Sequence, residues 1–149
     1  MIEAEILTPG DYVHVVAAII WQPCNRDKFL ISKRQKGKHL ADYWELPGGK
    51  VETGESRLQA LSRELNEEID IIPVNASAFK QVRHDYKDRS ILLDVWEVTS
   101  FKGQVRALEG QKVMWVATDR LAEFRFPQAD LPVLEAIANN VRVKTEHPL

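Results

Sequence analysis

The sequence of 149 residues contains a single cysteine, Cys24, and no apolar run long enough to cross a membrane. One cysteine excludes an intramolecular disulfide and a zinc site built from cysteines, and it is typical of proteins in a reducing cytosol. The most apolar stretch, residues 12–21, is far shorter than the ~18 residues that a membrane span needs. The first residues also lack the basic start of a signal peptide. These absences predict a cytoplasmic protein with no membrane partner.

The sequence also lacks an excess of charge of either sign. Twenty Lys and Arg residues against 22 Asp and Glu residues leave a net charge of −2. Proteins that coat nucleic acid by bulk charge need a strong positive excess, so we expect no nucleic acid polymer as a partner. The length, with 44% hydrophobic and 28% charged residues, is typical of one globular domain. We expect this domain to span residues 1–149, with its core at about 12–140.

Hydrophobic patterns predict strands and helices along the chain. Strands are predicted at residues 12–21, 28–34, 79–86, 90–99 and 112–117. Helices are predicted at residues 56–69 and 132–139. The first strand is rich in β-branched residues without polar alternation, which is typical of burial on both faces. The longer helix starts with a capping box of Ser56 and Gln59, and its apolar stripe consists of Leu58, Leu61, Leu65 and Ile69. Before it, Pro47, Gly48 and Gly49 are expected to interrupt regular structure.

The longer helix also carries three carboxylates at helical spacing. Glu64, Glu67 and Glu68 lie within ~100° of arc around the helix, beside its apolar stripe. Like charges at this spacing repel, and the helix dipole disfavours anions towards the C-terminal end, so we expect a cation to offset the cost. Clustered carboxylate oxygens suit Mg²⁺ or Mn²⁺, and Gly48 and Gly49 let the backbone approach a ligand closely. A solvated acidic helix face is the alternative.

This segment resembles the Nudix box. Gly49, Glu55 and residues 63–71 match the spacing of that motif, with Asp70 where the family usually has glycine. We expect Asp70 to adopt the left-handed backbone conformation that ends the helix, because aspartate tolerates it better than most residues. Residues 13–138 are similar to the MutT-like nucleoside triphosphate hydrolases. The resemblance implies an α/β fold, an α/β/α sandwich around a mixed sheet, and Mg²⁺- or Mn²⁺-dependent cleavage of a nucleoside triphosphate to the monophosphate and pyrophosphate.

The resemblance also implies roles for individual residues. The implied metal ligands are the carbonyl of Gly48 and the carboxylates of Glu64, Glu67, Glu68 and Glu109. The implied catalytic residues are Glu64 as general base, Glu67, and an ion pair of Arg63 with Glu55 or a neighbouring carboxylate. The implied substrate-binding residues are Arg34, His39, Glu45, Tyr86 and Asp130.

The identity of the nucleobase depends on Asp130. An ionised Asp130 only accepts hydrogen bonds, which suits an exocyclic amine such as cytosine N4, whereas a protonated Asp130 also donates and so suits 8-oxoguanine. Residues 46–49 and His39 resemble the branch that hydrolyses oxidised purine nucleotides, so we expect an 8-oxo-dGTP diphosphatase-like activity that cleans the nucleotide pool. Residues 129–136 resemble the CTP branch, which makes a CTP or modified-dCTP pyrophosphohydrolase the alternative. Asp130 as a mere helix cap, an ADP-ribose hydrolase and a non-catalytic nucleotide sensor are further alternatives, and both a monomer and a homodimer stay open.

Overall fold

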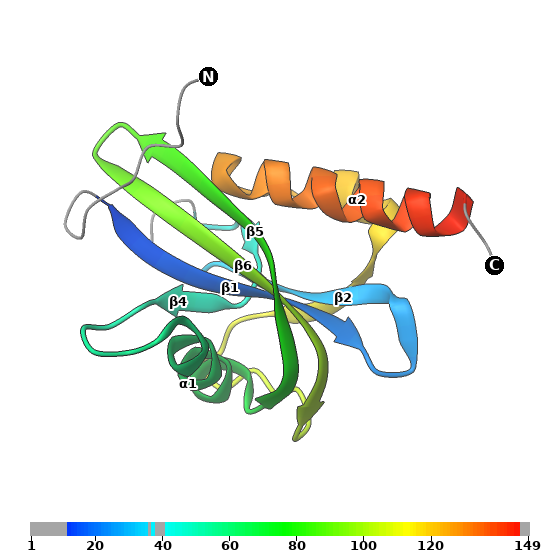
Figure 1. Cartoon of the computed structure of the whole chain (residues 1–149), viewed down its shortest axis with the longest axis horizontal. Helices are drawn as coiled ribbons and strands as arrows, with labels where there is room; N and C mark the ends of the chain where they lie inside the picture. The colour runs from blue at the N-terminus through cyan, green and yellow to red at the C-terminus, as the bar shows by residue number, and fades with distance from the viewer. Residues whose placement is uncertain (1–11, 36, 38–40, 147–149) are drawn as a thin grey trace.

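The computed structural model describes residues 12–35, 37 and 41–146, with side chains up to residue 140 (Figure 1). The strands are β1 (Val13–Gln22), β2 (Asn25–Lys33), β3 (Trp44–Glu45), β4 (Gly48–Lys50), β5 (Ile72–Tyr86), β6 (Arg89–Lys102) and β7 (Val113–Ala117). The α-helices are α1 (Arg57–Ile69) and α2 (Leu131–Glu146), and the 3₁₀ helices are η1 (Thr118–Glu123) and η2 (Gln128–Asp130). Of the helices in the described ranges, none is long and apolar enough to cross a membrane.

The strands form a mixed sheet between two helices. Its order is β3-β2-β1-β6-β5, while β4 pairs with β1 and β7 pairs with β2. Only β1 and β6 run parallel among these pairs of the described strands; the other pairs are antiparallel. Helix α1 lies against one face of the sheet and α2 against the other (Figure 1). The predicted α/β/α sandwich is confirmed.

Strand β1 is the centre of both hydrophobic cores. Its even-numbered residues from Val16 to Ile20 pack with the apolar side chains of α1, including Leu65. Its odd-numbered residues from Ala17 to Trp21 pack with the side chains of α2, including Val133. This alternation follows from the two-residue period of a strand. It explains why residues 15–21 are all apolar, and it confirms that the strand is buried on both faces.

Helix α1 has the caps that the sequence predicts. The Gln59 N–H donates to the Ser56 hydroxyl at 3.1 Å, and the Ser56 N–H donates to the Gln59 side chain at 2.8 Å. At the other end, Asp70 is left-handed, with φ 63° and ψ 35°, and its N–H donates to the Asn66 carbonyl. One part of the prediction was wrong: Leu58 is 47% exposed, and the buried face consists of Ala60, Leu61, Leu65 and Ile69.

The prediction that Pro47, Gly48 and Gly49 interrupt regular structure holds for Pro47, which lies between β3 and β4, and was wrong for the two glycines. Gly48 and Gly49 begin β4, which pairs antiparallel with β1 so that Gly48 lies opposite Ala17. A Cβ atom on Gly48 would stand 2.7 Å from the Ala17 Cα, closer than any real side chain comes. Glycine is present because two backbones meet closely and not because the chain turns. The short strand places Gly48 and Gly49 beside α1.

Candidate active site

A cavity of about 360 Å³ is lined by residues of β1, β3, β4, β5, β6, α1 and η2, and by loop residues after β2 and before β7. Its acidic group consists of Glu64, Glu68 and Glu109, with Gly48 beside them. Its second polar group consists of Arg34, Glu45, Tyr86 and Asp130. Apolar side chains between them include Val15, Ala17, Ile91 and Leu93. One cavity thus brings together most of the residues that the sequence assigns to metal and to substrate.

The carboxylates of the acidic group repel one another; Glu64 and Glu68 are partly buried, whereas Glu109 is exposed. Burial, followed by the charges of Glu64, Glu109 and Glu45, raises the pKa of Glu68 to about 9. The Gly48 N–H donates to the Glu68 carboxyl group at 3.1 Å. Burial also raises the pKa of Glu64, against the opposing effect of the neighbouring Arg63 guanidinium. Negative charge at Glu64 and Glu68 is therefore disfavoured in the protein alone, and a cation between them would offset this cost.

The donor atoms of this group suit a hard divalent cation. Among the described residues, no three His, Cys, Asp or Glu side chains already form a metal-binding cluster. Three carboxylates do face one cavity, and Mg²⁺ and Mn²⁺ are bound by a few carboxylates together with water and phosphate oxygens. A Cβ atom on Gly49 would stand 2.5 Å from both carboxylate oxygens of Glu64, so glycine is what leaves room for that carboxylate. The residues present fit such an ion as a partial set of ligands.

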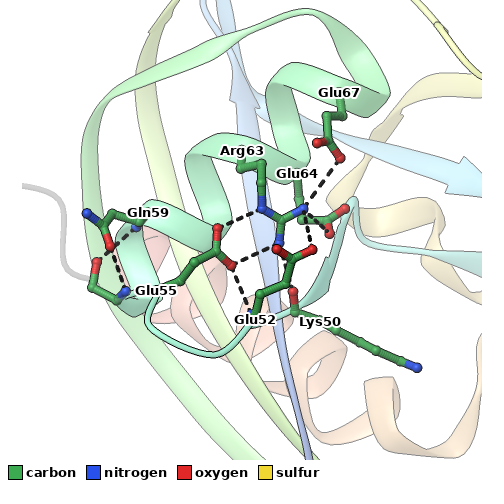
Figure 2. A network of polar contacts seen from close by, with 8 residues as sticks. Lys50, Glu52, Glu55, Gln59, Arg63, Glu64 and Glu67 are labelled. Carbon is green, nitrogen blue, oxygen red and sulfur yellow. Dashed lines mark hydrogen bonds and ion pairs between the residues drawn. The ribbon is translucent and has the colours of Figure 1, made fainter.

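Arg63 connects the segment before α1 to the helix (Figure 2). Its Nε and Nη2 atoms donate to the two carboxylate oxygens of Glu55 at 2.7 and 3.0 Å, and Nη2 also donates to the Lys50 carbonyl at 3.0 Å. Its Nη1 atom donates to Glu64 at 3.0 Å. The hydrogen bonds from Arg63 lower the pKa of Glu55 to about 2. The predicted pair of Arg63 and Glu55 is present, and it fixes the end of β4 relative to Glu64.

Glu67 and His39 differ from the other predicted site residues. Glu67 does not line the cavity; its side chain is 57% exposed and lies 3.4 Å from Nη1 of Arg63 (Figure 2). Its role as a ligand and catalytic group stays a prediction. His39 lies outside the described residues.

The second polar group of the cavity surrounds a buried carboxyl group. Asp130 is 7% exposed, and burial, followed by the charge of Glu45, raises its pKa to about 7, while Arg34 opposes the shift. Nη1 of Arg34 donates to Glu45 at 2.6 Å. The Tyr86 hydroxyl accepts the Ala129 N–H at 3.3 Å and so fixes the segment that carries Asp130. Asp130 directly precedes α2, as the cap interpretation requires, but its side chain lines the cavity.

Two buried polar residues whose side chains join separate elements were given no role by the sequence interpretation. Asp94 on β6 is fully buried and accepts from Arg57 at 2.5 and 2.8 Å, while His14 Nε2 lies 2.9 Å away. This contact joins the first residue of α1 to the sheet. A lone acidic residue in the apolar run of residues 91–96 was the available signal. The other, Gln111, is buried in the loop before β7; residues 108–111 resemble the loop that supplies an acidic ligand in the MutT-like enzymes, but the resemblance gave Gln111 itself no role.

Comparisons with known proteins identify the family of the chain. The profile of the NUDIX domain matches residues 16–136. An 8-oxo-dGTP diphosphatase of Escherichia coli (strain K12) is 37% identical over 108 residues, which are 72% of this chain and 84% of that protein. A CTP pyrophosphohydrolase of the same strain is 38% identical over 125 residues, which are 83% and 90% of the two chains. A solved structure from work on MutT of Aliivibrio salmonicida and Vibrio cholerae has a TM-score of 0.76 and 40% identity, over 87% of this chain and 98% of that one. The chain therefore belongs to the Nudix family of hydrolases, which act on phosphoric anhydrides.

Proposed function

We propose that the chain hydrolyses nucleoside triphosphates with an oxidised base, of the 8-oxo-dGTP kind, to the nucleoside monophosphate and pyrophosphate. The observation that carries this proposal is the single cavity in which an acidic group and the pocket around Asp130 lie together. A triphosphate presents both a chain of phosphates, which travels with a divalent cation, and a base with hydrogen-bonding edges. The names of two relatives, a diphosphatase and a pyrophosphohydrolase, support the same reaction.

We propose Mg²⁺ or Mn²⁺ as the cofactor. Glu64, Glu68, Glu109 and the Gly48 carbonyl would hold it, and Glu67 at the surface of α1 completes the proposed set. A divalent cation bound there would neutralise phosphate oxygens and lower the pKa of the attacking water. The support for this assignment is that three carboxylates line one cavity, where a positive charge would offset the burial of Glu68 and its repulsion by Glu64 and Glu109.

The proposed reaction is the attack of water on the anhydride. The water oxygen bonds to phosphorus, the bond between the monophosphate and pyrophosphate breaks, and Glu64 accepts the proton at its carboxylate. Arg63 holds Glu64 in place through the hydrogen bond at 3.0 Å and fixes the β4 backbone through Lys50. Arg34, whose Nη1 atom donates to Glu45, would contact a phosphate or the edge of the base.

The base would be selected by the protonation of Asp130. A protonated carboxyl donates from its hydroxyl to the O6 atom of 8-oxoguanine and accepts the N7–H that oxidation creates, as an asparagine side chain would. An ionised carboxylate accepts from cytosine N4 instead. The raised pKa of about 7 supports the first form at neutral pH and below. The second form, together with the 38% identical CTP pyrophosphohydrolase, supports CTP or modified dCTP as the second candidate.

The test is a pyrophosphate-release screen of the full chain with Mg²⁺ against 8-oxo-dGTP, dGTP, CTP, 5-methyl-dCTP and ADP-ribose. We expect 8-oxo-dGTP to have the highest kcat/KM. Highest activity on the cytosine nucleotides would favour the second candidate, and faster turnover of ADP-ribose than of every triphosphate would refute both. Glu64→Gln, which keeps the size of the side chain and removes its basic oxygen, is the inactive reference.

A further inference from the structure

The loop between β6 and β7 runs along the C-terminal end of α1. The Arg106 N–H donates to the Ile69 carbonyl at 3.0 Å, and the Leu108 N–H donates to the Glu68 carbonyl at 3.0 Å. The last carbonyls of a helix have no partner within the helix, so this loop satisfies two of them. The next residue in the loop is Glu109, whose side chain lines the cavity beside Glu68. The position of one acidic side chain thus depends on how the loop is attached to the helix.

A single side chain completes that attachment. Gln111 is 9% exposed; its amide nitrogen donates to the Glu68 carbonyl at 3.0 Å, and its amide oxygen accepts the Glu109 N–H at 2.9 Å. A flipped amide would set oxygen against the carbonyl and NH₂ against the N–H, so the two partners fix its orientation. The side chain of Gln35 donates to the Glu109 carbonyl. Both backbone polar groups of Glu109 are therefore held by glutamine side chains.

We propose that Gln111 is a positioning residue that holds the Glu109 carboxylate beside Glu68, so that the helix and the loop bind the divalent cation together. This proposal takes from the proposed function only the assumption that a divalent cation binds at the acidic group. Gln111 contacts the backbone of two acidic residues rather than their carboxylates, and it is uncharged. Replacing it changes the placement of Glu109 without altering the charge of the acidic group. Groups that orient metal ligands in this way commonly determine the affinity of the site.

The test measures binding of Mn²⁺ alone, by electron paramagnetic resonance of the free ion, with the full chain and no nucleotide. Gln111→Met keeps the length of the side chain and removes both hydrogen bonds. We expect it to bind Mn²⁺ about 10-fold more weakly than the wild type. Gln104→Met, an exposed position in the same loop, is the matched control and should bind as the wild type does. Melting temperatures of all variants confirm that they are folded.

A double-mutant cycle with Glu109→Gln asks whether Gln111 acts through Glu109. If it does, Gln111→Met in the Glu109→Gln background weakens Mn²⁺ binding by less than about twofold, because the carboxylate it positions is already absent. Unchanged affinity of Gln111→Met, or a full effect that persists in the Glu109→Gln background, would overturn the proposal. Should Gln111→Met fail to fold, Gln111→Asn, which has the same amide on a side chain one methylene shorter, takes its place in the same cycle. Triphosphate hydrolysis is not measured here, so an inactive wild type would refute the proposed function and leave this result standing.

Discussion

Gly49→Ala is expected to separate catalysis from folding in this protein. The added Cβ atom would stand 2.5 Å from both carboxylate oxygens of Glu64, and the Glu64 side chain can move whereas the backbone of β4 cannot. Restoring an ordinary contact of ~3.5 Å displaces the carboxylate by about 1 Å. A misplacement of that size can cost about 10²-fold in rate, so we expect kcat to fall about 100-fold.

The stability of Gly49→Ala should change little. Displacing Glu64 weakens its hydrogen bond with Arg63, but the bonds from Arg63 to Glu55 and Lys50 remain. Gly49 does not have a positive φ, so alanine can adopt its backbone conformation and lowers the entropy of the unfolded chain, which favours folding by ~0.4–1 kcal/mol. These effects oppose each other, and we expect the free energy of unfolding to stay within about 1 kcal/mol of the wild type.

Gly48→Ala is the matched control for this prediction. Its Cβ atom would meet the backbone of β1, including the Ala17 Cα at 2.7 Å, and neither strand can move without breaking the pairing of β4 with β1. We therefore expect Gly48→Ala to lower the melting temperature, which Gly49→Ala leaves near the wild-type value. The measurements are urea unfolding and kcat for pyrophosphate release. Full activity of Gly49→Ala, or a loss of stability equal to that of Gly48→Ala, would refute the reasoning.

Three further predictions concern charge. Arg63 lowers the pKa of Glu55 to about 2, so the ionised Glu55 carboxylate stabilises the fold above its unfolded pKa of 4.5, and this contribution is lost as the pH falls towards 2. The melting temperatures of the wild type and Glu55→Gln should converge over that pH range, and a constant difference would contradict this. Asp130, with its pKa near 7, should make the ratio of 8-oxo-dGTP to CTP turnover fall as pH rises through 7; Asp130→Asn should abolish that dependence, whereas an unchanged profile would leave Asp130 as a helix cap. Excess EDTA should remove activity, and a near-normal rate in EDTA would refute the metal mechanism. Glu67→Gln should lower activity by orders of magnitude in a folded protein, and a near-normal rate would show that Glu67 takes no part in it.

The helix and its caps could be predicted because their causes lie close together in the sequence. Ser56 and Gln59 are three residues apart, and the left-handed Asp70 follows the last buried residue of the apolar stripe. Strand β4 could not be predicted, because the reason for Gly48 is its neighbour Ala17, distant in the sequence. The role of Gln111 depends likewise on contact between a loop and a helix end that pattern alone does not bring together.

The features of α1 that oppose stability lie at the cavity, and those that favour stability surround it. Its carboxylates repel one another, yet Leu61 and Leu65 anchor the helix in the core, and the capping box holds its first turn. Two ion pairs hold the start of α1: Arg63 binds the Glu55 carboxylate and also donates to the Lys50 carbonyl at the end of β4, and Arg57 binds the buried Asp94. These contacts fix the backbone of α1, so the repulsion between its carboxylates can shift side chains but does not unwind the helix. The backbone that carries Glu64 and Glu68 is therefore held in place for the proposed cation. Removing the pair of Arg63 and Glu55 or the pair of Arg57 and Asp94 should weaken cation binding before it unfolds the sheet.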